Sequence, residues 1–229
     1  MVSIAVVVIL LALALPSLRL AREGGVSTKA LILLRQAQAA TDLYANDNRE
    51  RFMFFATPGD PAGSIELFGV KPLGYPKFFL IQSGWSLAAL RDYLAPIEAF
   101  RIERPSEGEQ ATPVFVGRAF FTCTAFAAPE FWVPPTGASD LTMLRHTSRD
   151  QVAFPHAKGS WLDETVGPFS HSRNQAQRNN FHMACFDGSA RIMNETDYQK
   201  AESVTPLFGE APTMPPMTSA QGLRGRDFH

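Results

Sequence analysis

The chain begins with Met1-Val-Ser-Ile-Ala-Val-Val-Val-Ile-Leu-Leu-Ala-Leu-Ala-Leu-Pro-Ser-Leu18, a stretch without any charged side chain. Up to Leu15 its only polar side chain is Ser3, so a helix over this stretch would be apolar on every face. A helix of this length spans roughly 27 Å, close to the thickness of the hydrocarbon core of a membrane. We therefore expect residues 1–18 to be the transmembrane half of an N-terminal helix.

Helical periodicity continues beyond this stretch. Gly24-Gly25 should weaken the helix by about 2 kcal/mol relative to two alanines, so a bend or loosened turn is expected there. Asn46-Asp47-Asn48 should end the helix, because these side chains compete for backbone hydrogen bonds. Residues 19–48 are thus predicted to form its soluble half. Small or apolar residues follow one stripe of that half at steps of three and four: Val26, Ala30, Leu33, Ala37, Ala40 and Tyr44.

Residues 49–202 are predicted to form one globular domain, since 229 residues hold an anchor and a single compact unit. The abundance of phenylalanine and proline favours β-structure with irregular connections over a helical bundle. Prolines, glycines and methionines recur without a period in residues 203–229, which we expect to be a poorly ordered tail. Strands are predicted over residues 51–56, 113–127 and 151–154, and a helix over residues 86–94.

Asp187-Gly188 is the strongest local signal in the domain. It separates two short runs with alternating side chains, and Asp-Gly is favoured where a tight turn needs positive φ. We therefore predict a β-hairpin whose turn is structural rather than catalytic or metal-binding. The predicted fold class is α+β, with a long N-terminal helix packed on a small antiparallel sheet.

Four short segments follow one another in the N-terminal part of the chain: Leu15-Pro16-Ser17-Leu18, Ala21-Arg22-Glu23, Leu34-Arg35-Gln36 and Leu43-Tyr44-Ala45-Asn46-Asp47-Asn48. In this order and at these distances they resemble those of type IV pilin-like proteins and type II secretion pseudopilins with a prepilin-type cleavage and methylation signal. Trp85 and the leucines after it resemble the short middle helix of these proteins. The segment from Phe186 to Arg191 resembles the Asp-Gly hairpin of their H-X9-DG C-terminal region.

The resemblance implies a filament subunit without cofactor or catalytic residues. Such a subunit is anchored once in the inner membrane, carries its domain outside the cytoplasm, and assembles with other pilin or pseudopilin subunits through their assembly machinery. In this chain the residues expected to anchor the helix and pack it in the filament are Ile4, Ala5, Val8, Leu11, Ala12, Leu15 and Pro16.

The chain departs from the pilin pattern in three respects, one of which is that the cysteines usual in these proteins are replaced, one of them by Ala30. Mature pilins begin with a Gly-Phe-Thr-Leu-x-Glu type segment, and alignment on Pro16 places its glutamate before Met1. We therefore expect upstream codons to encode a short basic leader and this segment. The histidine of the C-terminal motif is also displaced, because His171 precedes Asp187 by fifteen intervening residues instead of nine.

Cys123 and Cys185 are the two cysteines of the chain, and both lie in strand-like runs. An extracytoplasmic domain permits a disulfide, and neighbouring strands could bring the two sulfur atoms within bonding distance. We hypothesise that they pair. The alternative is that each is a small buried apolar side chain.

Other functions are less well supported by the sequence. Ala12-Leu13-Ala14 resembles a secretory cleavage site, which would release a secreted ligand-binding module; the same module tethered to the membrane is a second alternative. A metal-dependent hydrolase is a third, but its candidate ligands lack metal-site spacing, and no nucleophile motif is present. The net charge of −1 gives no drive toward nucleic acid. Those candidate ligands are His146, His156, His171, His182, Asp150, Asp163, Glu164 and Asp187.

Overall fold

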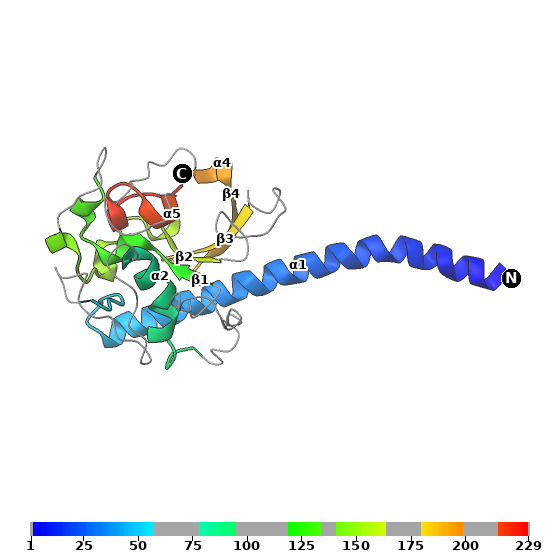
Figure 1. Cartoon of the computed structure of the whole chain (residues 1–229), viewed down its shortest axis with the longest axis horizontal. Helices are drawn as coiled ribbons and strands as arrows, with labels where there is room; N and C mark the ends of the chain where they lie inside the picture. Colours follow the sequence, from blue (N-terminus) through cyan, green and yellow to red (C-terminus); the bar gives the residue numbers. More distant parts are fainter. Residues whose placement is uncertain are drawn as a thin grey trace, which may run out of the picture.

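A long N-terminal helix, α1 (Val2–Asp47), is mounted on a domain built around a small antiparallel sheet (Figure 1). This computed structural model describes residues 2–56, 78–94, 119–133, 141–163, 180–198 and 215–228. The C-terminal half of α1 packs on β2, β3 and β4, while its N-terminal half projects away from the domain. The α+β prediction, with one helix on a small antiparallel sheet, is confirmed.

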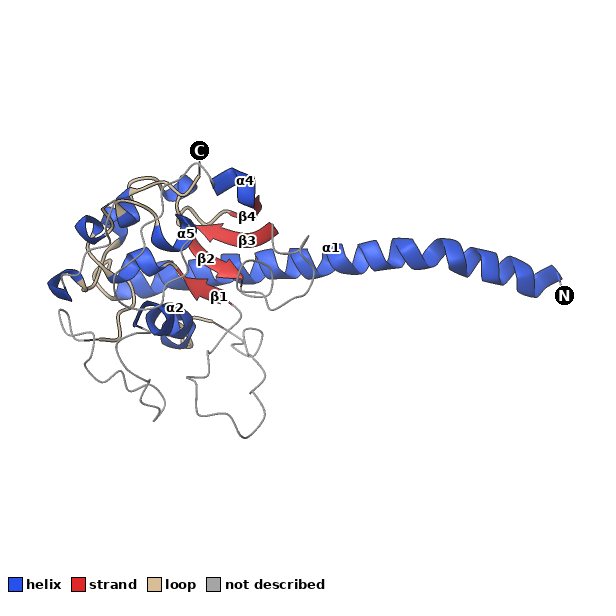
Figure 2. Cartoon of the chain, turned by 45° about the horizontal axis from the view of Figure 1, so that its top comes forward, coloured by secondary structure: helices blue, strands red, loops and turns tan. Residues whose placement is uncertain are grey.

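The sheet has four strands in the order β1-β2-β3-β4, each antiparallel to its neighbour (Figure 2). A bulge interrupts the pairing of β2 with β3 between Gly159 and Trp161. Helix α2 (Phe78–Ala89) packs against β1. The strands are β1 (Ala119–Phe121), β2 (Gly159–Asp163), β3 (Asn180–Cys185) and β4 (Ala190–Asn194).

Short helical turns make up much of the remaining described chain. Three of them begin with a proline, Pro129, Pro155 and Pro215, whose fixed φ suits the first helical position. These turns are η3 (Cys123–Phe126), η4 (Pro129–Phe131), η5 (Leu141–Met143), η6 (Arg149–Gln151), η7 (Pro155–Ala157), α4 (Glu195–Tyr198), α5 (Pro215–Thr218) and η8 (Gly222–Arg224).

Helix α1 runs without interruption through Pro16 and Gly24-Gly25. The two glycines do not interrupt the helix, because a propensity cost of about 2 kcal/mol does not end a helix that continues on both sides. The bend expected there stays a prediction. The helix ends where predicted. Arg49 and Glu50 both adopt left-handed backbone angles, with φ of 59° and 63°, and the Glu50 N–H donates to the carbonyl of Ala45 at 2.7 Å.

The predicted hairpin is confirmed. Strands β3 and β4 pair from Asn180 with Asn194 to Ala184 with Ala190, and the turn between them places Gly188 at φ +82°. The carboxylate Oδ1 of Asp187 accepts hydrogen bonds from the backbone N–H of Ser189 at 2.9 Å and from its hydroxyl at 2.6 Å. Asp187 thus folds the turn through its own side chain.

Gly188→Ala is expected to destabilise the domain by about 1 kcal/mol, because an L side chain is strained at positive φ. Asp187→Asn should be nearly neutral, since the amide oxygen can accept the same two hydrogen bonds. Thermal unfolding of both variants checks this. A calcium-dependent rise in melting temperature that Asp187→Asn abolished would show that the turn binds metal.

Aromatic rings dominate the core. Phe121 on β1 lies 4.9 Å from the Trp161 ring on β2 and 5.6 Å from that of Phe52, measured between ring centroids. Residues 52–55, predicted as part of a strand, form no named strand; only Arg51 makes an isolated bridge, to Ser148. The apolar run that begins at Phe78 is helical. The ring of Phe78 packs edge-on against the ring of Phe79.

The prediction of a poorly ordered C-terminal tail is wrong for residues 215–228. Met217, Leu223, Asp227 and Phe228 are all buried in this segment. Gly222 has φ +58°, and a Cβ on it would collide with the indole of Trp132, so the segment closes over that ring only with glycine there. Residues 203–214 lie outside the described residues.

Candidate functional site

The C-terminal half of α1 is the part of the helix that is fixed to the domain. Leu34, Ala37, Ala40 and Ala45 are buried against the sheet. Three of these four residues are alanines, whose small side chains let the helix axis approach the strands closely. Of the stripe predicted from the sequence, Ala37 and Ala40 are buried, Ala30, Leu33 and Tyr44 are partly buried, and Val26 is exposed, so only its C-terminal part faces the domain.

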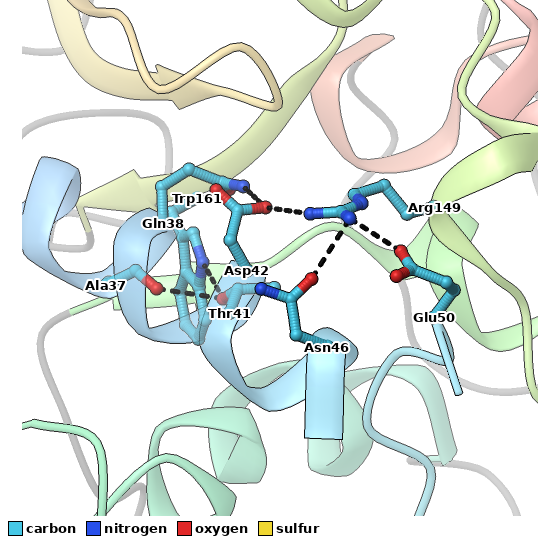
Figure 3. Close-up of polar contacts among 8 residues, drawn as sticks. All are labelled: Ala37, Gln38, Thr41, Asp42, Asn46, Glu50, Arg149 and Trp161. Atoms are coloured by element: carbon cyan, nitrogen blue, oxygen red, sulfur yellow. Dashed lines mark hydrogen bonds and ion pairs between the residues drawn. The ribbon is translucent and has the colours of Figure 1, made fainter. Parts of the chain in front are cut away.

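A buried hydrogen-bond chain joins the helix to the sheet (Figure 3). The indole Nε1–H of Trp161 on β2 donates to the Thr41 hydroxyl at 3.0 Å, and that hydroxyl donates to the Ala37 carbonyl at 2.8 Å. Trp161 and Thr41 are both fully buried, so this chain fixes the position of the helix along its own axis as well as its distance from the sheet.

Arg149 makes a second, more exposed junction at the end of α1. Its guanidinium contacts the Glu50 carboxylate at 2.7 Å, donates to the Asn46 side-chain oxygen at 3.1 Å and lies 3.8 Å from Asp42 (Figure 3). Burial raises the pKa of Asp42, partly offset by the Gln38 amide and by Arg149. The Arg149 and Glu50 side chains are each nearly half exposed, so solvent screens these pairs and each contributes little stability alone. Together they orient the end of the helix.

A third junction lies nearer the middle of α1. The Ser27 hydroxyl is 2.6 Å from Nε2 of His182 on β3, and Nδ1 of His182 lies 3.7 Å from the Asp163 carboxylate. The residue types match a hydrolytic triad, but 3.7 Å is too long for a hydrogen bond that would orient the imidazole. Ser27 also lies inside a helix, where its backbone N–H is already bonded. We interpret the trio as a contact that holds α1 on the sheet.

The stability of this junction should depend on pH. Burial lowers the pKa of His182, and the attraction of Asp163 only partly opposes it. As the pH falls, this histidine is protonated in the unfolded chain at about pH 6.5, and in the folded chain only at a lower pH. The free energy of unfolding therefore decreases between about pH 6.5 and the lower pKa of the folded state. Urea unfolding across this range should show the loss in wild type and a smaller one in His182→Gln. Equal slopes would contradict the assignment.

The N-terminal half of α1 projects away from the domain (Figure 1), and several of its apolar side chains are exposed. Leu15, Leu18 and Leu20 are 63%, 68% and 69% exposed. Leu15 and Leu18, three positions apart, share one face of the helix, and Leu20 lies on the opposite side, so apolar surface is exposed on two faces. An exposed apolar surface of this kind is typical of a site that another apolar surface covers.

The residues expected to anchor the helix all lie in this projecting half. Leu15 and Pro16 are exposed within it. Ile4, Ala5, Val8, Leu11 and Ala12 belong to the helical backbone, but their side chains lie outside the described part of the structure. A search of the described residues finds no helix that combines the length and the apolar character needed to cross a membrane.

Cys123 and Cys185 are both free thiols and both buried, so the hypothesised disulfide is wrong. The strand order gives the reason. Cys123 follows β1, Cys185 ends β3, and β2 lies between them. Two strand spacings place the two backbones roughly 10 Å apart, beyond the Cα–Cα distance that a disulfide spans. Burial raises the pKa of both thiols, that of Cys185 to about 11.

Binding of a small ligand or metal has weaker support in the described regions. A cavity of about 260 Å³ lies beside the C-terminal end of α1, smaller than most ligand sites. Among the described residues no group of three or more metal-ligating side chains comes together, and His171 and Glu164 lie outside them. The cavity is lined by Tyr44, Asp47, Asn48, Arg49, Arg51, Phe52 and His146.

Comparison with known proteins gave no match: no family model, no curated protein and no solved structure matches this chain.

The junctions made by Trp161, Arg149 and His182 were not anticipated from the sequence. Each joins residues more than a hundred positions apart, and no local pattern marks such a pair.

Proposed function

We propose that the chain is a pseudopilin-like structural subunit, anchored in the inner membrane through α1 and able to assemble into a type IV pilus or type II secretion pseudopilus. The projecting apolar half of α1 carries this proposal. A helix that served only the fold of its own domain would not need the leucines at positions 15, 18 and 20 to face solvent.

The two halves of α1 divide the work of such a subunit. The C-terminal half, here called the mounted half, is fixed to the domain by its buried alanines and by contacts with Trp161, Arg149 and His182. The projecting half is continuous with it, so a force on the projecting half reaches the domain through an unbroken helix. In our proposal the domain faces the extracytoplasmic side and sets the lateral contacts of the filament.

Assembly would exchange one apolar environment for another. In the membrane, acyl chains cover the projecting half; in the filament, neighbouring helices cover it instead. Ala14 and Ala21 are one heptad apart and exposed, so they give one face on which a second helix could approach closely. The leucines beside them supply the packing surface.

Vesicle flotation tests the membrane part of the proposal. The full chain is mixed in detergent with phosphatidylcholine, the detergent is removed, and the vesicles are floated through a density gradient. We expect the chain to float with the lipid, and externally added proteinase K to digest the domain while a peptide covering residues 1–18 survives. A chain that stays at the bottom of the gradient would contradict membrane anchoring.

A further inference from the structure

Lys158 and Asp227 form an ion pair in the interior of the domain, apart from the junctions of α1. The Lys158 Nζ lies 2.9 Å from the Asp227 Oδ1, and both side chains are fully buried. Lys158 directly precedes β2, and Asp227 lies near the end of the C-terminal segment, 69 positions later. The pair therefore joins the last described segment to the sheet.

Two further groups converge on the same carboxyl group. The backbone N–H of Gly159 donates to Oδ2 of Asp227 at 2.7 Å. The Ser219 hydroxyl contacts Lys158 Nζ and also hydrogen-bonds to Asp227. The carboxyl group thus has an amine at Oδ1, a backbone donor at Oδ2, and a hydroxyl that contacts both the amine and the carboxyl group.

We propose that Lys158 and Asp227 condense to an intramolecular isopeptide bond, which covalently staples the C-terminal segment to β2. The amine nitrogen is already in contact with the carboxyl group it would attack, and no ordering of loose side chains is needed. The product keeps the Gly159 hydrogen bond, because Oδ2 becomes the amide oxygen.

The reaction is a condensation that releases one water. The ammonium first passes a proton to Oδ1, which leaves a neutral amine beside a neutral carboxylic acid. Nζ attacks Cγ, forming the C–N bond, and the Gly159 N–H stabilises the charge that develops on Oδ2. The Ser219 hydroxyl relays one proton from nitrogen to Oδ1. The Cγ–Oδ1 bond then breaks, and water leaves.

The surroundings favour the neutral pair that this reaction requires. Burial lowers the pKa of Lys158 and raises that of Asp227, and their mutual attraction opposes both shifts. A buried ion pair returns little net stability, because desolvation of the two charges offsets their attraction. The amide carries no charge and removes that cost.

Mass spectrometry of the full chain tests the proposal. We expect the intact wild-type mass to be lower than the sequence mass by one water. Trypsin should fail to cut after Lys158 and should yield the peptide of residues 150–173 joined to Asp227-Phe-His229. Lys158→Arg keeps the positive charge but has a non-nucleophilic guanidinium, so its mass should equal the sequence mass. In Asp227→Asn the same bond would release ammonia instead of water.

The proposal is overturned if folded wild-type protein, after prolonged incubation at neutral pH, has the full sequence mass and releases Asp227-Phe-His229 as a free peptide. It is also overturned if Lys158→Arg retains the loss of one water, because the dehydration would then lie elsewhere. Should Lys158→Arg fail to fold, the wild-type peptide map alone decides.

Discussion

Trp161→Ala is expected to lower the free energy of unfolding by about 3–5 kcal/mol, which corresponds to a fall of roughly 10 °C in melting temperature. Trp161 is fully buried, packs on Phe121 and is the β2 residue whose indole N–H reaches the Thr41 hydroxyl on α1. The substitution therefore opens a large cavity and also releases the helix from the sheet. Thermal and urea unfolding of the full chain measure the effect.

Two phenylalanine variants separate the hydrogen bond from the packing. Trp161→Phe keeps a ring in the core but removes the donor to Thr41. Trp132 is equally buried, and its indole N–H has no hydrogen-bond partner among the described residues, so Trp132→Phe serves as the matched control. Trp161→Phe should cost about 1 kcal/mol more than Trp132→Phe. Equal losses would show that the bond to Thr41 contributes nothing.

Val8→Asp is expected to reduce membrane insertion of the full chain by roughly a hundredfold. A carboxylate near the middle of a membrane-spanning segment costs about 2.5–3.5 kcal/mol, while valine there is slightly favourable. Position 8 lies near the centre of residues 1–18 and far along the chain from the residues of α1 buried in the domain. The melting temperature of the domain should therefore be unchanged.

The matched control for Val8→Asp is Val133→Asp, which places the same charge on a half-exposed valine of the domain. It should float with vesicles like the wild type. If Val8→Asp floated equally well, residues 1–18 would not be the anchor. If both variants were lost from the lipid fraction, the domain surface rather than α1 would bind the membrane.

The features predicted correctly from the sequence are those with a local cause. The hairpin follows from Gly188, which accepts positive φ, and from Asp187, whose carboxylate caps its own turn. The mounted half of α1 follows from a helical stripe of small residues ending at Asn46-Asp47-Asn48. Both signals lie within a few positions of the structure they determine, so a single sequence is enough to find them.

The features missed or mistaken depend on long-range packing. The C-terminal segment, residues 215–228, has a composition typical of disordered chain. It is nevertheless buried, because Asp227 forms an ion pair with Lys158 and Gly222 packs against Trp132. The cysteine hypothesis failed because two strand-like runs need not be adjacent strands, and β2 lies between them. The order of the strands in the sheet depends on how the whole core packs, and the sequence of a single strand does not reveal it.

Disulfide cross-linking of the projecting helix in vesicles tests the central claim most directly, that this half of α1 packs on the same half of other copies. Single cysteines are introduced at Leu15 and Leu18, which share one face of the helix, and at Leu20, which lies on the opposite side. Cys123 and Cys185 are buried with raised thiol pKa values, so the introduced thiol is the reactive one. The account predicts covalent dimers that depend on which face carries the cysteine, and none from Val133→Cys. Monomers only, or dimers equally from all four variants, would contradict it.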